Sequence, residues 1–311
     1  MPGSLLSIIT LIVLESGRIG SLPAPLPWGE TGHIMAARAA VELLPSTMPA
    51  FVRAAGERLA WLNPEPDRWR SRELGAMDQF FSYDHYIDFE NVPEGALEST
   101  DRWRFVEALY DAGIERPERD VGFLPYRIEE LYQRVLTGFR QWRATTGPER
   151  EWIEDRILND AGILGHYVTD GSQPHHTTIH FNGWNASGAQ QAPNPEGFTS
   201  ERDFHGRFES DFVRAHVRYE HVQARMPRRA RELGTPDRVR EAVHAFLLDT
   251  HQQVHALYRL ENTSRFDPNG DASADHVEFT ADRLAAGAAL LGALWWSAWL
   301  DSARPIPEEG R

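Results

Sequence analysis

Apolar residues recur with the 3.6-residue period of an α-helix in seven stretches of this 311-residue sequence. The alternating pattern of a half-buried β-strand is nearly absent. Clusters of proline, glycine and asparagine separate the periodic stretches. The sequence therefore predicts an all-α fold, a single and mostly helical domain. The seven stretches are residues 33–44, 101–115, 126–144, 148–170, 200–224, 236–261 and 277–303.

Two other segments need a separate interpretation. Residues 177–199 form the longest irregular stretch, and a loop of this length inside a compact domain is usually functional or disordered. Residues 284–300 form an uncharged apolar run at the lower length limit of a membrane span. Small residues dominate this run, and Arg283 and Asp301 flank it. We expect a buried core helix here, with a membrane-anchored helical protein as the alternative.

Composition excludes several kinds of active site. All 32 basic residues are arginine and cysteine is absent, which excludes Schiff-base lysines, phosphate-loop lysines, disulfides and thiolate zinc sites. A metal site must therefore use histidine, carboxylate or backbone ligands. The formal net charge of −14 argues against a broad cationic surface for nucleic acid, although bound metal ions can supply local positive charge.

The N-terminus has the character of an export signal. Residues 5–14 are an apolar run of signal-peptide length, and a proline-rich stretch follows and ends at Trp28. We expect residues 1–27 to be a signal peptide and residues 28–311 to be a secreted or periplasmic domain.

Residues of metal-binding type are concentrated between positions 166 and 176. His166 and Asp170 are four residues apart, so on a helix their side chains lie on one face. Gly171 and Pro174 end that helix, and His176 follows, where it can fold back toward the same point. A histidine and a carboxylate in this arrangement form half of a tetrahedral zinc site.

A second pair, His205 and Glu209, has the same spacing. One such pair alone is more often a surface ion pair, but two pairs and a third histidine in a chain without cysteine favour a metal centre. His251 and His255 are also four apart, yet no acid completes a ligand set, and we expect them to have packing or surface roles. We treat His175 and His180 as residues that surround the cluster.

Upstream residues supply less certain candidates. His85 lies in an aromatic segment that includes Phe81 and Tyr83. Trp28 and His33 stand at the two ends of a glycine-containing turn that leads into the first periodic stretch. Three acids are candidate partners for His85, namely Asp67, Asp78 and Asp84. Spacing alone does not choose among them.

In their order along the chain, these residues resemble the superfamily of zinc-dependent phospholipases C and secreted single-strand-specific nucleases. The resemblance covers Trp28 to Glu209, and the central His-x3-Asp-x5-His motif is complete. It implies an all-helical phosphodiesterase with three zinc ions in a cleft between helices and long loops. The first zinc would be held by Asp67, His85, His166 and Asp170. The second would be held by His176, His205 and Glu209. The third would be held by His33, Asp170, and the amino nitrogen and carbonyl oxygen of Trp28.

The resemblance also implies an activity. We expect a zinc-dependent hydrolase of phosphoester bonds, most closely a nuclease for single-stranded nucleic acid or nucleotides, working as a monomer without a stable protein partner. In the family, the residue that matches Asp67 is also proposed to help deprotonate the attacking water. The candidate substrate contacts are Phe81, Tyr83 and Asn185. A phospholipase C is the first alternative, and a non-catalytic binding protein with structural zinc is the second.

Overall fold

The computed structural model describes residues 28–186 and 192–305. The expected signal peptide, residues 1–27, lies outside the described residues. Those residues contain α-helices, short 3-10 helices and one π-helical turn but no β-strand, which confirms the prediction of a single all-α domain.

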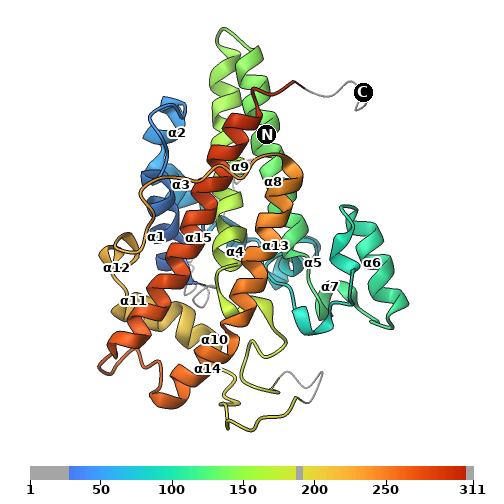
Figure 1. The fold of residues 1–311 in the computed structure, drawn as a ribbon, viewed down its shortest axis with the longest axis vertical. Helices are drawn as coiled ribbons and strands as arrows, with labels where there is room; N and C mark the ends of the chain where they lie inside the picture. The colour runs from blue at the N-terminus through green and yellow to red at the C-terminus, as the bar shows by residue number, and fades with distance from the viewer. Residues whose placement is uncertain (1–27, 187–191, 306–311) are drawn as a thin grey trace, which may run out of the picture.

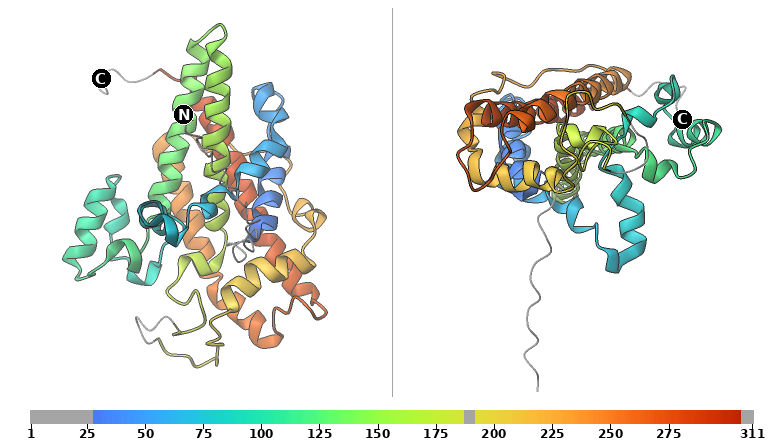
Figure 2. Two further views of the ribbon diagram at one scale, coloured as in Figure 1. Left: turned by 180° about the vertical axis from the view of Figure 1, so that it is seen from behind. Right: turned by 90° about the horizontal axis from the view of Figure 1, so that it is seen from below.

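Helix α9 (Glu149–Asp170) lies at the centre of the fold. It packs against α1 (Gly29–Glu42), α3 (Gly56–Leu62), α8 (Leu124–Ala144) and α15 (Ala274–Asp301). Helices α8 and α9 form a long antiparallel pair, which extends to the top of the molecule in Figure 1 and is seen from behind in Figure 2. The helix that carries His166 and Asp170 is therefore surrounded by other helices.

Two glycines allow α3 to approach α9 closely. A Cβ atom on Gly162 would lie 2.4 Å from the Cβ of Leu62, and one on Gly165 would lie 2.6 Å from Nδ2 of Asn63. The C-terminal part of α9 from Asp160 onward is buried at every position. Close packing by small residues thus places Asn63 beside the part of α9 that carries His166 and Asp170.

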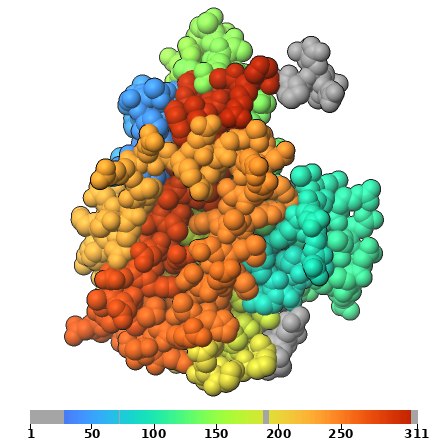
Figure 3. All heavy atoms as spheres, in the orientation of Figure 1, coloured from blue at the N-terminus to red at the C-terminus, as the bar shows by residue number. Residues whose placement is uncertain are grey.

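Helix α15 contains the apolar run 284–300. Among the described residues, Ala274–Asp301 is the helix that is long and apolar enough to cross a membrane, and 72% of its most apolar window is buried inside the molecule. It packs on α1, α8, α9 and α12. In Figure 3 a strip of α15, coloured red, lies between α12 and α13 on the face turned to the viewer. The structure thus has the buried core helix that the sequence favours.

Two of the predicted long helices are broken. Residues 200–224 do not form one helix, because Val217 and Arg218 are extended and the Arg218 N–H donates to Nδ1 of His221. Residues 236–261 are divided at Gln253, whose N–H donates to the carbonyl of Thr250 in a tight turn. Neither break contains glycine or proline, so local sequence gives no signal for it. The resulting elements are α10 (Phe204–Gly206), η6 (Arg207–Phe212), α11 (Val213–His216), α12 (Tyr219–Gln223), α13 (Pro236–Gln252) and α14 (Val254–Thr263).

Short elements connect these helices. They are α2 (Ala50–Ala54), α4 (Glu65–Arg68), η1 (Arg72–Leu74), α5 (Gly75–Phe81), η2 (Ser82–Asp84), η3 (Phe89–Asn91), η4 (Ala96–Glu98), α6 (Arg102–Asp111), α7 (Pro117–Asp120) and η5 (Pro174–Thr177). Helices α6 and α7 lie to one side of the main bundle (Figure 1).

The described part of 177–199 after η5 contains no helix or strand, as the sequence predicts. It is held against the fold by side chains of α13 and α14. Nδ1 of His251 donates to the carbonyl of Thr177 at 2.8 Å, and the hydroxyl of Tyr258 donates to the carbonyl of His180. The ring of His180 stacks on Trp184 with centroids 3.9 Å apart. The loop is therefore packed where it leaves η5.

Candidate metal centre

Seven elements or turns bring the predicted ligands together inside the fold. His166 and Asp170 lie on the last turns of α9, and the helix ends at Gly171 as predicted. The other side chains approach from α1, α4, the turn after η2, η5, α10 and η6. Their donor atoms form three groups, each within 4.8 Å, and the first two groups share His166. The groups are His33, Asp67 and His166; His85, His166 and Asp170; and His176, His205 and Glu209.

The first cluster consists of Asp67, His85, His166 and Asp170. Oδ2 of Asp170 lies 2.9 Å from Nδ1 of His85 and 3.1 Å from Nε2 of His166. The two ring nitrogens are 3.0 Å apart. Oδ1 of Asp67 lies 3.8 Å from Nδ1 of His85 and 3.7 Å from Nε2 of His166. All four side chains are buried.

This geometry fits a tetrahedral zinc site. Ligands 2.0–2.1 Å from a tetrahedral ion are separated by about 3.3 Å, close to the distances in the first cluster. Both carboxylate oxygens of Asp67 are buried and make no hydrogen bond. Because a buried carboxylate without hydrogen bonds is costly, a cation is a natural partner for Asp67.

The structure distinguishes Asp67 from the two other candidate acids. Asp84 accepts a hydrogen bond from Nη2 of Arg102 at 2.7 Å and lies 3.7 Å from Nε of Arg127. Asp78 accepts one from the hydroxyl of Ser82. Only Asp67 of these three acids joins the described groups of donor atoms around His85 and His166.

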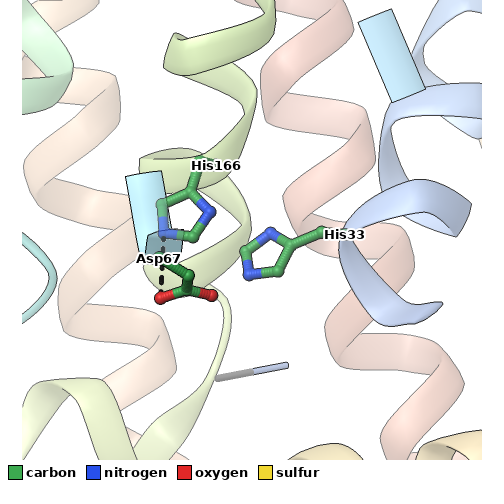
Figure 4. A group of neighbouring side chains, drawn as sticks. All are labelled: His33, Asp67 and His166. Carbon is green, nitrogen blue, oxygen red and sulfur yellow. Dashed lines mark ion pairs between the residues drawn. The ribbon is translucent and has the colours of Figure 1, made fainter. Parts of the chain in front are cut away.

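His33 lies next to Oδ1 of Asp170, the carboxylate oxygen that does not contact His85 or His166. Its Nε2 is 3.5 Å from Oδ1 of Asp170, and both atoms are buried without a hydrogen-bond partner. The ring stacks on that of His166 with centroids 4.2 Å apart. Figure 4 shows His33, Asp67 and His166 pointing toward one another from separate elements. The two oxygens of Asp170 therefore face different histidines, as a bridging ligand requires.

The second cluster is more open. Nε2 of His205 lies 2.8 Å from Oε2 of Glu209 and 3.1 Å from Nε2 of His176, and the third side of this triangle is 3.4 Å. The side chain of His205 is 18% exposed, whereas those of His176 and Glu209 are 4% exposed. Three protein ligands beside solvent leave a coordination position for water or substrate. Glu209 lies in the π-helical turn η6, a feature often found at functional sites.

Hydrogen bonds orient two of these histidines. Nδ1 of His176 donates to the carbonyl of His85 at 2.7 Å, so its Nε2 faces His205 and Glu209. Nδ1 of His33 donates to Oδ1 of Asn63 at 2.8 Å, which directs the Nε2 lone pair toward Asp170. A partner of this kind commonly orients histidine in metal sites.

The buried charges shift the ionisation of the metal-free cluster. Burial raises the pKa of Asp67, although His166 opposes the shift. Burial alone would raise the pKa of Asp170, but His166 and His176 outweigh it and hold the pKa well below its usual range. Burial alone would lower the pKa of His176, but Asp170 and Glu209 raise the pKa to about 9. Asp170 is therefore held as an anion beside positive charge, the situation that a bound cation would also provide.

Trp28 lies at the start of α1, one turn before His33. It is fully buried, with its ring 5.6 Å from that of Phe208. Its carbonyl accepts a hydrogen bond from the Gly32 N–H at 3.0 Å, which leaves one lone pair free. The structure thus brings Trp28 to the same end of the fold as Glu209.

The three predicted substrate contacts are in different situations. Phe81 packs on Trp69 with ring centroids 5.0 Å apart and lies beneath the guanidinium of Arg127. Tyr83 is half-buried against the core. The side chain of Asn185 closes the loop by bonding both the N–H and the carbonyl of Ala192. The contact with Trp69 keeps Phe81 beside the segment that carries Asp67. The bonds of Asn185 connect two parts of its own loop.

Several other histidines make contacts outside these groups. His244 pairs with Glu129, and His255 lies 3.7 Å from Glu196. His175 is buried with its ring 5.2 Å from that of His205.

Sequence reasoning did not identify Asn63 or Arg70. Nη1 of Arg70 lies 3.6 Å from Oδ1 of Asp67, at the edge of the first cluster. The sequence signal that could have identified Arg70 is its position three residues after Asp67, since side chains at this spacing are neighbours on a helical turn. Asn63 gives no such signal, because it meets His33 only through tertiary packing.

Comparison with models of protein families found no match, and no curated protein matches the chain. The geometry of the site therefore has to support the functional argument.

Proposed function

We propose that this protein is a zinc-dependent hydrolase of phosphoester bonds. The observation that carries the proposal is the pairing of one closed ligand cluster with one open cluster. They adjoin at Asp170, whose Oδ1 lies 3.8 Å from Nδ1 of His176. A purely structural zinc site needs four closed ligands, whereas the open second cluster has the three-ligand form of a catalytic site. The resemblance to zinc-dependent phospholipases C and nucleases supports the same conclusion.

The residues divide the chemistry in a simple way. Zinc, when bound, would neutralise the phosphodiester charge and lower the pKa of coordinated water toward neutrality. The family resemblance would also give Asp67 the role of accepting a proton from the attacking water, and both of its oxygens are without a hydrogen bond. Asp170 and Glu209 hold the ions, and His205 lies where substrate can enter.

Nucleic acid is the proposed substrate class. The chain leaves Asp67 through Trp69 and Arg70 and reaches Phe80 and Phe81, whose rings are 5.4 Å apart. Aromatic rings in a segment that also contains an arginine, here Arg70, offer stacking surfaces for bases and a cationic contact for phosphate. Phe80 is 71% exposed, so its ring is accessible.

One observation favours phospholipid as a second candidate. Helix α5 has no buried residue, and Leu74, which precedes it, is 55% exposed. The right view of Figure 2 shows this segment standing away from the rest of the protein. An apolar projection beside a hydrolytic centre is also suited to contact with acyl chains.

A paired assay tests the proposal. Protein that begins at Trp28 and is loaded with zinc is incubated with single-stranded DNA and, separately, with phosphatidylcholine vesicles. We expect cleavage of the DNA that a chelator abolishes and added zinc restores. The matched control is Asp67→Asn, which keeps the size of the side chain but removes the charge, and which should lose activity.

The other outcomes discriminate between the candidates. Cleavage of phosphatidylcholine alone selects the phospholipase. Failure to cleave either substrate, despite stoichiometric bound zinc, would leave the structural-zinc alternative and reject the hydrolase for these substrates.

A further inference from the structure

Gln173 lies between the end of α9 and the second ligand cluster. Its side chain is fully buried, and it is the residue immediately before η5, the 3-10 helix that carries His176. A buried amide must satisfy both a donor and an acceptor. In this protein both partners belong to the environment of the metal centre.

The two ends of the Gln173 amide make different contacts. Oε1 accepts the backbone N–H of His175 at 2.7 Å, and this bond caps η5. Nε2 donates to Oε2 of Glu209 at 2.9 Å. Because the acceptor end is fixed by a backbone N–H, the amide can present only its donor to Glu209.

The contact with Glu209 involves the ligand oxygen itself. Oε2 is also the atom that lies 2.8 Å from Nε2 of His205 and 3.4 Å from Nε2 of His176. A carboxylate oxygen has two lone pairs. Donation from Gln173 occupies one and leaves the other directed at the point that the three ligands share.

We propose that Gln173 is the positioning residue of the second cluster. It holds Glu209 as a ligand through one oxygen, and through the cap of η5 it holds His176 in register with it. The amide does this without adding a positive charge that would compete with a cation. The inference rests on the metal site of the proposed function and not on the identity of the substrate.

Zinc titration tests the role without relying on activity. Gln173→Met keeps the length of the side chain but removes both polar contacts. Gln173→Asn keeps the amide but is one carbon shorter, so it cannot reach both partners. We expect both variants to bind zinc at the second cluster about 10- to 100-fold more weakly, the usual effect of losing an outer-shell partner. Affinity at the first cluster should stay unchanged.

Ser172→Ala is the matched control. Ser172 is also buried, and its hydroxyl donates to a backbone carbonyl, that of Thr169, and not to the side chain of a proposed ligand. His205→Ala identifies which binding step belongs to the second cluster. Equal weakening of all steps, or an affinity for the second cluster within twofold of that of Ser172→Ala, would overturn the positioning role. Absence of that binding step from the unmodified protein would instead refute the metal site, so the two failures are distinguishable.

Discussion

Asp170 is the residue on which the proposed centre depends most. Its Oδ2 faces His85 and His166, and its Oδ1 faces His33. His205, in contrast, belongs only to the second cluster. Residues with these different positions should have different effects on metal content.

We therefore predict that Asp170→Asn loses more zinc than His205→Ala. The asparagine cannot bridge two ions with charged oxygens, so the metals on both sides of position 170 should be lost, whereas His205→Ala should lose one ion. Elemental analysis of purified protein after dialysis measures the count per chain. Circular dichroism confirms that both variants are folded. Equal zinc content in the two variants would contradict the bridging role.

His176 gives the metal affinity a defined pH dependence. The pKa of about 9 in the metal-free protein, which Asp170 and Glu209 raise despite burial, means that His176 is protonated at neutral pH. Zinc needs the unprotonated Nε2, so binding releases this proton, and affinity should rise with pH until about 9 and then level off with respect to this group. The increase is at most about tenfold per pH unit for one proton.

Titrations between pH 6.5 and 9.5 with a competing chelator measure this dependence, and calorimetry in buffers of different ionisation enthalpy counts the released protons. A zinc affinity of the second cluster that does not change with pH over this range would show that the metal does not displace a proton from His176.

At the level of residues, local spacing was sufficient to predict that some candidate ligands lie together, but it was not sufficient for others. His166 with Asp170, and His205 with Glu209, lie on helical turns, so their side chains share a face whatever the tertiary fold. Spacing alone did not favour Asp67, which the resemblance assigned, over Asp84, because the distinction depends on Arg102 being packed next to Asp84. Asn63 and Gln173 were not predictable for the same reason.

At the level of elements, the contact between α3 and α9 positions His33 through Asn63. Gly165→Ala should disturb that contact, because the new methyl group would lie 2.6 Å from Nδ2 of Asn63 and 3.1 Å from Leu291. Overpacking of this kind costs about 1–3 kcal/mol, more than the gain in helix propensity of roughly 1 kcal/mol. We expect a lower free energy of unfolding and weaker zinc binding at His33.

Urea unfolding of the metal-free protein and zinc analysis measure the two effects. Gly75→Ala is the matched control, since a Cβ there meets no atom within 4 Å, and it should leave zinc content unchanged. An unaltered zinc content in Gly165→Ala would show that zinc binding at His33 does not depend on the contact between α3 and α9.

The elements were predicted well where periodicity continued without interruption. Helices α8, α9 and α15 follow the predicted stretches closely. The breaks at Val217 and Gln253 were missed because neither contains glycine or proline, the residues by which a sequence marks the end of a helix. The break at Gln253 allows α14 to bring Tyr258 onto the loop at His180, and no pattern within a single helix encodes that requirement.

At the level of the whole molecule, the start of the described chain packs against the segment that carries Glu209. Trp28 and Gly29 both adopt left-handed backbone conformations, with φ of 42° and 44°. A Cβ on Gly29 would lie 3.3 Å from the Cα of Ser210, the residue after Glu209. This sharp turn packs Gly29 against η6, the element that carries Glu209, and the ring of Trp28 packs on Phe208 of the same element.

Removal of residues 1–27 should therefore change metal content and not only location. A free α-amino group has a pKa near 8, and its neutral form is a good nitrogen ligand, whereas an amide nitrogen is not. Protein that begins at Trp28 should bind one more zinc ion than protein with a single methionine before Trp28, and that ion should be lost first as pH falls. Both forms keep the first and second clusters, so their shared zinc ions are the internal control. Equal zinc content in the two forms would exclude the amino group as a ligand and would leave His33 and Asp170 without a partner from the chain terminus.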